Sequence, residues 1–212
     1  MDHQLKTVNI YNQYVQEYLN KFMNMDLYND TFDDFLNLLP QDSSVIELGC
    51  GPGNVIRYFL NKRKDLKILG VDLAPAMLKQ AANINPEAEF LLLDIRNLSA
   101  VNHSYDAVVG AFCLPYLSTE DLEEFFSASG KIIRLNGLLY ISCMEGESLK
   151  SGYEKTSFTG EEELYIYYHQ REYLELLLSR NHLIVEKFYT KDYPESDGSF
   201  TTDLVYIARK VK

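Results

Sequence analysis

Short apolar runs alternate with helix-like stretches through the middle of the chain. The runs that we expect to form β-strands cover residues 44–48, 66–72, 89–94, 105–112 and 138–144. Apolar residues recur at helical spacing in the segments between them, over residues 54–64, from Pro75 to about Ala81, and from Ser118 to Leu135. Strands separated by helices of this length are typical of a parallel sheet with right-handed crossovers and with helices on both faces.

Local signals delimit the last of these helices and predict how the chain ends. Ser118 and Asp121 resemble a capping box, and Asn136-Gly137 is expected to end the helix before the fifth strand. Residues 171–180 again show helical spacing, and the turn-rich segment 191–199 separates two further strand-like runs, 183–189 and 203–208. Because that connection is short, we expect an antiparallel pair at the edge of the sheet.

Two segments lie outside the alternating pattern. Residues 5–39 carry apolar side chains at helical spacing and predict two amphipathic helices. Residues 145–168 fall between the fifth strand and the last helix. The 212 residues are enough for one domain with accessory parts. We divide it into a helical cap (1–40), a core (41–144), a lid insertion (145–170), and a terminal helix with an antiparallel hairpin (171–212).

Charge and composition exclude several classes of protein. Twenty basic and 31 acidic residues give a net charge of -11, which disfavours binding to phosphate backbones. No run of about 18 apolar residues suggests a membrane span, and the first residues do not resemble a secretory signal. The three widely spaced cysteines suggest neither disulfides nor a zinc cluster. We therefore expect a cytoplasmic protein, monomeric or homodimeric, without a metal and without nucleic-acid or membrane partners.

A glycine-rich segment follows the first expected strand and precedes a helix. Gly49, Gly51 and Gly53 permit a tight turn and a close approach of the backbone to a ligand. The N-terminus of the following helix offers unpaired N–H groups to an anionic group. On this loop alone, an ordinary strand-to-helix turn remains an alternative.

Acidic residues occur at the ends of three successive strands. Asp72 ends the second strand and can accept hydrogen bonds from both hydroxyls of a ribose. Asp94 ends the third strand and can accept from an adenine amine, while Ile95 packs on the ring. Glu47 lies two residues before Gly49. Parallel sheets bind ligands at this carboxyl edge, so the pattern indicates a nucleoside site.

Taken together, these motifs resemble the class I S-adenosylmethionine-dependent methyltransferases. The resemblance rests on Glu-Leu-Gly-Cys-Gly-Pro-Gly over 47–53, Val-Asp at 71–72, Leu-Asp-Ile over 93–95, and the segments 105–112 and 135–139. It implies S-adenosyl-L-methionine as cofactor. It also implies a Rossmann-like α/β fold with seven strands, mostly parallel, in the order 3-2-1-4-5-7-6, with the seventh strand antiparallel.

The resemblance also implies roles for individual residues. The loop backbone would face the amino-acid moiety of the cofactor, Asp72 the ribose and Asp94 the adenine amine. Glu47 would orient the loop or reach the cofactor amine through water. The expected cofactor-binding residues are Glu47, Gly49, Cys50, Gly51, Gly53, Asp72, Leu73, Met77, Asp94, Ile95, Ala111 and Phe112.

The methyl acceptor is expected to be a small molecule that attacks the methyl group in line. A sulfonium methyl is already activated, so positioning and exclusion of water supply most of the catalysis. Residues 113–116, Cys-Leu-Pro-Tyr, lack the polar residue that enzymes acting on DNA-base amines carry after the fourth strand, and no Pro-Cys pair is present. Both points argue against a nucleic-acid substrate.

Tyrosines are concentrated in the two segments outside the core. The chain has 16 tyrosines and no tryptophan. They predict an aromatic substrate pocket or, alternatively, helices packed on the sheet with their hydroxyls in water. The expected substrate and lid residues are Tyr11, Tyr14, Tyr18, Tyr116 and Tyr167, and His169 is the candidate base if the reaction needs one.

Three other functions remain open from the sequence. A dinucleotide dehydrogenase would need a third glycine where Asn54 stands, and it gives no role to Asp94. A module that binds S-adenosylmethionine without catalysis would have a lid collapsed on the cofactor. A protein side-chain methyltransferase would need an open, groove-like mouth, whereas residues 145–168 look long enough to close the site.

Overall fold

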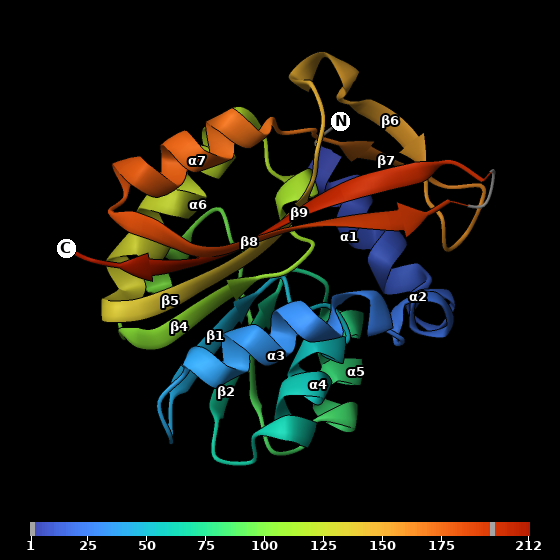
Figure 1. Cartoon of the computed structure of the whole chain (residues 1–212). Helices are drawn as coiled ribbons and strands as arrows, with labels where there is room; N and C mark the ends of the chain where they lie inside the picture. The colour runs from blue at the N-terminus through green and yellow to red at the C-terminus, as the bar shows by residue number, and fades with distance from the viewer. Residues whose placement is uncertain (1–2, 196–197) are drawn as a thin grey trace.

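A seven-stranded sheet forms the centre of the protein, in the order β3-β2-β1-β4-β5-β9-β8 (Figure 1). The computed structural model describes residues 3–195 and 198–212. The strands of this sheet are β1 (Ser44–Leu48), β2 (Lys67–Asp72), β3 (Glu89–Leu92), β4 (Tyr105–Gly110), β5 (Ile133–Met144), β8 (Leu183–Pro194) and β9 (Phe200–Lys210). The first five are parallel, and β9 is antiparallel to both of its neighbours. With the separate hairpin β6–β7 left out of the numbering, the predicted order 3-2-1-4-5-7-6 is confirmed.

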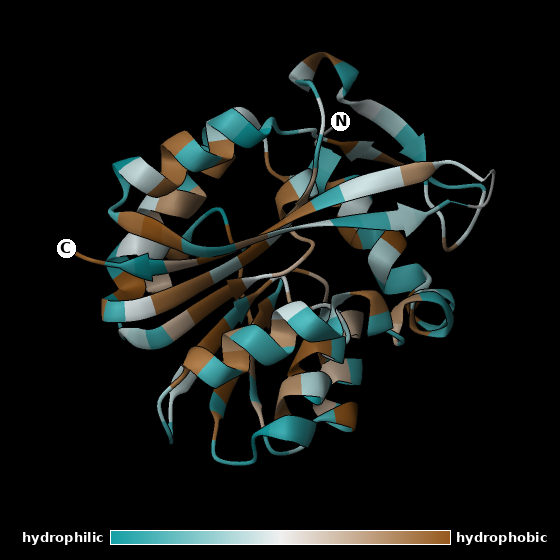
Figure 2. Ribbon diagram, viewed as in Figure 1, coloured by the Kyte–Doolittle hydropathy of each residue, from teal (hydrophilic) through white to brown (hydrophobic). Residues whose placement is uncertain are grey.

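Helices cover both faces of the sheet because successive strand residues point to opposite sides. One face packs against α3 (Asn29–Leu38), α4 (Asn54–Lys62) and α5 (Pro75–Ile84). The other packs against α6 (Thr119–Ile132) and α7 (Arg171–Arg180). Strand β1 shows the alternation, with Val45 in the first core and Ile46 in the second. In Figure 2 the central strands are largely brown, whereas the covering helices alternate between brown and teal.

The predicted antiparallel pair near the C-terminus is confirmed, but its strands are longer than expected. Strand β9 pairs with β5 on one side and with β8 on the other, so β8 forms the edge of the sheet. The pairing continues to Pro194 and Phe200, into the segment predicted as a turn. Ser196 and Asp197, which also belong to that predicted turn, lie outside the described residues.

The junction between α6 and β5 corrects one expectation. The capping box is present, with the Ser118 hydroxyl accepting from the backbone N–H of Asp121 at 3.1 Å. The helix ends at Ile132 rather than at Asn136-Gly137, and the chain enters β5 directly. Asn136, with a φ of 65°, and Gly137 instead lie in an irregularity where the register between β4 and β5 shifts. Asn136-Gly137 therefore marks a bulge in β5 and not the end of the helix.

The N-terminal segment contains three helices where two were predicted. They are α1 (His3–Gln13), α2 (Val15–Phe22) and α3, with the 3-10 turn η1 (Asp26–Tyr28) before α3. Helix α3 belongs to the core, because Phe32 and Phe35 are fully buried against Phe59 and Tyr140. Among the described residues, no helix has both the length and the apolar character needed to cross a membrane.

The lid insertion forms a small hairpin beside the first helix (Figure 1). Its strands are β6 (Gly152–Lys155) and β7 (Glu163–Ile166), paired antiparallel. Ile10 of α1 packs against Leu164 and Ile166 of β7. The remaining 3-10 turns are η2 (Leu98–Ala100), η3 (Leu114–Tyr116) and η4 (Ser148–Lys150). Contacts between α1 and β7 therefore join the predicted helical cap to the predicted lid insertion.

Candidate functional site

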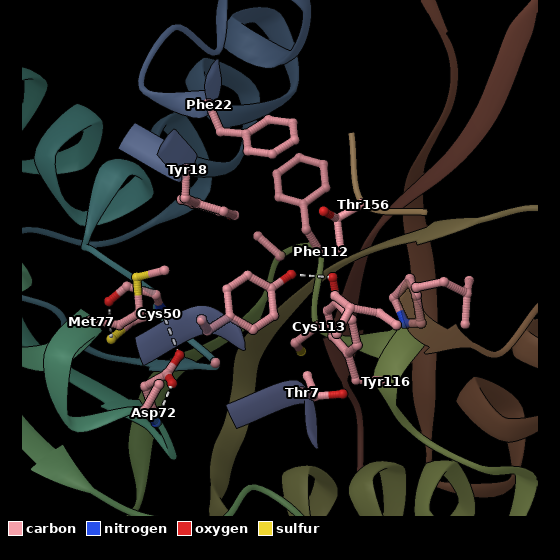
Figure 3. Close-up of a pocket in the computed structure, with 18 of the residues that line it drawn as sticks. Thr7, Tyr18, Phe22, Cys50, Asp72, Met77, Phe112, Cys113, Tyr116 and Thr156 are labelled. Carbon is pink, nitrogen blue, oxygen red and sulfur yellow. Dashed lines mark hydrogen bonds between the residues drawn. The ribbon is translucent and has the colours of Figure 1, made fainter. Parts of the chain in front are cut away.

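A cavity of about 520 Å³ lies at the carboxyl ends of the parallel strands. The glycine loop after β1 and the ends of β2 and β4 form one part of its wall, and α1, α2 and the β6–β7 hairpin cover it. Figure 3 shows Asp72, Cys50 and Met77 on one side and Cys113 and Tyr116 on the other, with Tyr18 and Phe22 above. This volume lies within the range of about 300–1,000 Å³ that small-molecule sites occupy.

The three glycines of the loop have positive φ angles, which are unfavourable for residues with a side chain. Gly49, Gly51 and Gly53 have φ angles of 72°, 52° and 81°. A Cβ on Gly49 would lie 2.7 Å from the Cβ of Cys113, so this turn packs closely against the chain after β4. A Cβ on Gly51 would meet nothing within 4 Å, and Gly51 lines the cavity. The loop therefore presents bare backbone to open space, where a ligand can approach.

Asp72 joins the end of β2 to this loop. Its Oδ2 accepts from the backbone N–H of Gly51 and its Oδ1 from that of Ala74, each at 2.8 Å. Burial raises the pKa of the Asp72 carboxyl, and these backbone N–H groups oppose the rise. Each carboxylate oxygen has a further lone pair. Asp72 can therefore hold the loop and accept two hydrogen bonds from a ligand at the same time.

Glu47 supplies a buried acceptor that the protein leaves unsatisfied. The residue is 3% exposed, and its Oε2 has no hydrogen-bond partner among the described residues. Burial, reinforced by the charge of Asp72, raises the pKa of Glu47 well above its usual range, while the backbone N–H of Ile56 lowers it. Ile56 lies in the first turn of α4, where Gly53 at the N-cap offers no side chain. A cationic ligand group beside Oε2 would satisfy this oxygen and favour its ionised form.

Asp94 lines the cavity beyond the end of β3, but it already has a partner. The Arg96 guanidinium donates to both carboxylate oxygens, with Nη2 at 2.6 Å from Oδ2 and Nε at 3.0 Å from Oδ1. Burial opposes ionisation of Asp94, yet the hydrogen bonds from Arg96 outweigh it and lower its pKa. An adenine amine at this position would therefore share the carboxylate with Arg96.

On the far side of β4 the cavity wall contains residues that the motifs did not identify. Tyr28 of η1 donates its O–H to Oδ2 of Asp203 at 2.5 Å. Its ring packs edge-on against Phe112, with centroids 4.8 Å apart. Phe112 has a φ of 60°, and its backbone N–H donates to the Ser142 hydroxyl at 2.9 Å. No sequence motif connects Tyr28 with Asp203, because the two residues are 175 positions apart. The sequence showed only that an acidic residue begins the strand predicted over 203–208.

Aromatic side chains from the N-terminal helices and the hairpin close the cavity. Tyr11 stacks on Phe158 with centroids 5.5 Å apart, and Tyr18 meets the same ring edge-on at 5.6 Å. The hydroxyls of Tyr11 and Tyr116 are hydrogen-bonded. Burial raises the pKa of both phenols, so they remain protonated. These aromatic side chains thus form an uncharged part of the cover, as a site that excludes water requires.

The structure brings most of the expected site residues together around one cavity. Those that line it are Glu47, Gly49, Cys50, Gly51, Asp72, Leu73, Met77, Asp94, Ile95, Ala111, Phe112, Tyr11, Tyr18 and Tyr116. Gly53, Tyr14 and Tyr167 do not line it. Gly53 precedes α4 and its carbonyl accepts from the Asn85 side chain at 2.9 Å, and the Tyr14 hydroxyl lies 3.4 Å from Glu162.

His169 is placed away from the cavity, which removes the geometric reason for proposing it as a base. It is 4% exposed and does not line the cavity. Its Nε2 lies 3.3 Å from the carbonyl oxygen of Leu114. Burial lowers the pKa of the imidazole, and the carbonyls of Leu114 and Leu117 oppose this shift. The contact of His169 with the Leu114 carbonyl therefore links the segment after β7 to the turn η3.

The known proteins to which this chain is similar include several methyltransferases. A family model described as a methyltransferase domain matches residues 45–137. The chain is 32% identical to a trans-aconitate 2-methyltransferase of Enterobacter sp. (strain 638) over 99 residues, which cover 47% of this chain and 38% of that protein. It is 30% identical to a tRNA N(3)-methylcytidine methyltransferase of Schizosaccharomyces pombe over 132 residues, 56% of this chain and 43% of that one. The chain thus spans about two fifths of the length of these curated relatives.

The fold is shared more widely than the sequence. The crystal structure of magnesium protoporphyrin IX methyltransferase from Synechocystis PCC 6803, which contains bound S-adenosylmethionine, superposes with a TM-score of 0.71. The alignment covers 99% of this chain and 98% of that one at 14% identity. At this level of identity the likeness concerns the fold, and it extends through the N-terminal helices and the C-terminal hairpin.

Proposed function

We propose that this chain is a class I S-adenosylmethionine-dependent methyltransferase that transfers the methyl group of its cofactor to a small-molecule acceptor by direct in-line displacement. The cofactor supplies a methyl group that is already activated by the sulfonium charge. The protein must then bind the cofactor, orient the acceptor and keep water out.

The unsatisfied Oε2 of Glu47 is the observation that carries this proposal. S-adenosylmethionine bears an ammonium group and a sulfonium beside a nucleoside. The buried oxygen of Glu47, the acceptor atoms of Asp72 and the open space beside Gly51 belong to one cavity. Glu47 would meet the cofactor ammonium, Asp72 the ribose hydroxyls, and Asp94 with Ile95 the adenine. NADH has no cationic group that would satisfy Glu47.

The cover over the cavity supports a small acceptor. Tyr11, Tyr18 and Phe158 close it from above, and the chain is strongly acidic, which opposes binding of nucleic acid. One relative acts on tRNA, so tRNA belongs among the acceptors to be tested. Trans-aconitate, the substrate named for another relative, is the corresponding small-molecule probe.

Two measurements test the proposal in sequence. Thermal melts with S-adenosylmethionine, S-adenosylhomocysteine and NADH come first. A ligand at about 100 times its dissociation constant should raise the melting temperature by roughly 5–11 °C. We expect this shift with the two S-adenosyl compounds, and a shift with NADH alone would contradict the cofactor assignment.

Transfer of a deuterium-labelled methyl group is then followed by mass spectrometry in a small-metabolite extract, in tRNA and in protein. We expect a labelled small molecule. Label in tRNA or in protein would contradict a small-molecule acceptor and assign that macromolecule as the substrate. Cofactor binding without transfer to any of the three would make the chain a non-catalytic binding module.

A further inference from the structure

A buried carboxylate lies in the half of the cavity that the cofactor motifs do not reach. Asp203 pairs in register with Met144, the last residue of β5, because β9 runs antiparallel and begins at the edge where β5 ends. Both residues line the cavity. Asp203 thus lies at the same edge of the sheet as Asp72, but on the opposite side of β4.

Tyr28 holds this carboxylate in a fixed position. Asp203 is 5% exposed, and the Tyr28 hydroxyl donates to its Oδ2. The Tyr28 ring is in turn packed against Phe112, which the resemblance places beside the cofactor. Because Tyr28 engages one carboxylate oxygen, the other is left to accept a hydrogen bond from a ligand in the cavity.

The surroundings of Asp203 are acidic rather than basic. The titratable groups that face it are Tyr28, Tyr140, Cys143, Tyr193, Glu195 and its register partner Lys191. The Lys191 ammonium is turned away and donates to both carboxylate oxygens of Asp30 at 2.7 Å. Among the described residues Asp203 forms no ion pair, so an acceptor here meets a carboxylate that no cation neutralises.

We infer that Asp203, positioned by Tyr28, is the residue that binds the nucleophilic O–H or N–H of the methyl acceptor and takes its proton. This inference rests on the proposed methyl transfer. The acceptor's oxygen or nitrogen forms a bond to the methyl carbon, and the carbon–sulfur bond breaks with its electron pair passing to sulfur. The acceptor proton passes to the Asp203 carboxylate, which later releases it to water.

The protonation state of Asp203 at neutral pH suits a proton acceptor. Burial raises its pKa to about 6, while the hydrogen bond from Tyr28 lowers it and the charge of Glu195 raises it. Above that pH the group is ionised and can accept a proton, and its basicity is closer to neutral pH than that of an ordinary carboxylate. Tyr28 cannot replace it, because burial and Asp203 raise the pKa of the phenol.

The same geometry selects a class of acceptor. The cations among the described cavity residues are Lys21, Arg96 and Lys155. Arg96 is bound to Asp94, Lys21 donates to the Ser157 carbonyl at 2.9 Å, and Lys155 is exposed on β6. A carboxylate acceptor at Asp203 would therefore lie against the charges of Asp203 and Glu195, and none of these three cations is ion-paired to Asp203. The site fits a small neutral or cationic hydroxyl or amine compound.

The test compares three variants of the full chain. Asp203→Asn keeps the size of the side chain and an oxygen for Tyr28, but it cannot take a proton. Tyr28→Phe leaves Asp203 ionisable and removes its hydrogen bond. Asp30→Asn is the control, since it removes one acidic charge near Lys191 outside the cavity, on a side chain that is 60% exposed.

Acceptors are offered as matched sets on one carbon skeleton, namely benzylamine, benzyl alcohol and benzoate, together with trans-aconitate and the metabolite extract. Labelled product is identified by mass spectrometry, and binding of S-adenosylmethionine is measured by calorimetry. We expect amine or ether products. We also expect kcat/KM to be lower by about 100-fold in Asp203→Asn, with cofactor affinity unchanged and Asp30→Asn like the parent.

The pH profile separates a proton acceptor from a structural residue. In the parent, activity should fall as the pH drops through about 6, because the protonated carboxyl cannot accept a proton. Tyr28→Phe should move this limb to higher pH, since a donor that favours the ionised form is lost. The limb should be absent in Asp203→Asn.

Several results would overturn the inference and leave the proposed function intact. They are a methyl ester as product, activity in Asp203→Asn within threefold of the parent, or an acid limb that Tyr28→Phe does not move. If no acceptor of any class is methylated although the cofactor binds, the proposed function itself fails and the inference falls with it.

Discussion

The two halves of the cavity are built differently. On the half that we propose for the cofactor (the cofactor half), Asp72 at the end of β2 accepts from the backbone N–H of Gly51 in the glycine loop after β1 and from that of Ala74. On the acceptor half, the wall at β5 and β9 is held by side chains, with Tyr28 bonded to Asp203 across 175 positions of sequence. The first half depends on local backbone geometry, and the second on the tertiary packing of distant segments.

This difference explains why one half forms a motif and the other does not. A strand, a glycine turn and a helix N-terminus are consecutive in the chain, so their residue types keep fixed spacings. Tyr28 reaches Asp203 only because α3 packs on the sheet face formed by Tyr140, Val205 and Ile207. Substitutions in the cofactor half should therefore disturb the backbone and lower cofactor affinity or stability. Substitutions in the acceptor half should lower the rate of methyl transfer while the fold is retained.

The largest effect is expected for Asp72→Ala on the cofactor half. The change leaves the N–H groups of Gly51 and Ala74 without their acceptor and, in our proposal, the ribose hydroxyls as well. At about 1–3 kcal/mol for each unpaired group, affinity for S-adenosylmethionine should fall by more than about 100-fold. Calorimetric titration measures this, and Asp72→Asn should lose less because it keeps one acceptor. Unchanged affinity in the alanine variant would remove Asp72 from the site.

Gly49→Ala tests the backbone of the same half. The left-handed φ of 72° and the approach of a Cβ to within 2.7 Å of Cys113 should together cost about 2–5 kcal/mol of unfolding free energy. Gly160→Ala is the matched control, with a φ of 74° and nothing within 4 Å, and should cost about 1–2 kcal/mol. Urea denaturation compares the two. Equal losses would mean that the contact with Cys113 is unimportant.

His169→Ala should reduce stability and leave turnover within about twofold. The loss of a buried imidazole that contacts the Leu114 carbonyl should cost about 1–3 kcal/mol at pH 8. The folded-state pKa of His169 is lowered. As the pH falls below the ordinary value of about 6.5, the unfolded chain therefore takes up a proton that the folded chain does not, and stability drops.

The stability difference between the parent and His169→Ala should accordingly shrink at pH 5.5. His103→Ala, which removes an imidazole from an exposed position, is the control. Denaturation curves at the two pH values measure both variants. A selective loss of turnover with unchanged stability would restore His169 as a catalytic candidate.

The smallest effect is expected for Tyr11→Phe, in the aromatic cover of the cavity. Tyr11→Phe keeps the ring on Phe158 but removes the hydrogen bond to Tyr116. A loss of about 0.5–1.5 kcal/mol should raise KM by at most about tenfold, with kcat little changed. Tyr14→Phe, whose hydroxyl faces Glu162 outside the cavity, should behave like the parent. Equal effects of the two variants in steady-state kinetics would argue against a covering role for Tyr11.

The sequence by itself determined the sheet and one part of the cavity wall. Its short apolar runs and helical spacings predicted the strands of the core in their correct places, and β1 and α7 were predicted to the residue. The glycine loop and the acids Glu47, Asp72 and Asp94 all lie on the cavity wall, as the motifs indicated. The physical reason is that these features are local, since spacing along the chain fixes which backbone groups meet at a strand end.

The tertiary structure alone decided the acceptor half and the roles of residues in the insertion. The aromatic run 165–168 lies partly in β7, and His169 points into protein rather than into the cavity. Asp203 and Tyr28 come together through the antiparallel return of β9 and the packing of α3. Such contacts depend on the free energy of burying whole faces against one another, and no spacing within a segment encodes which distant side chains then share a cavity.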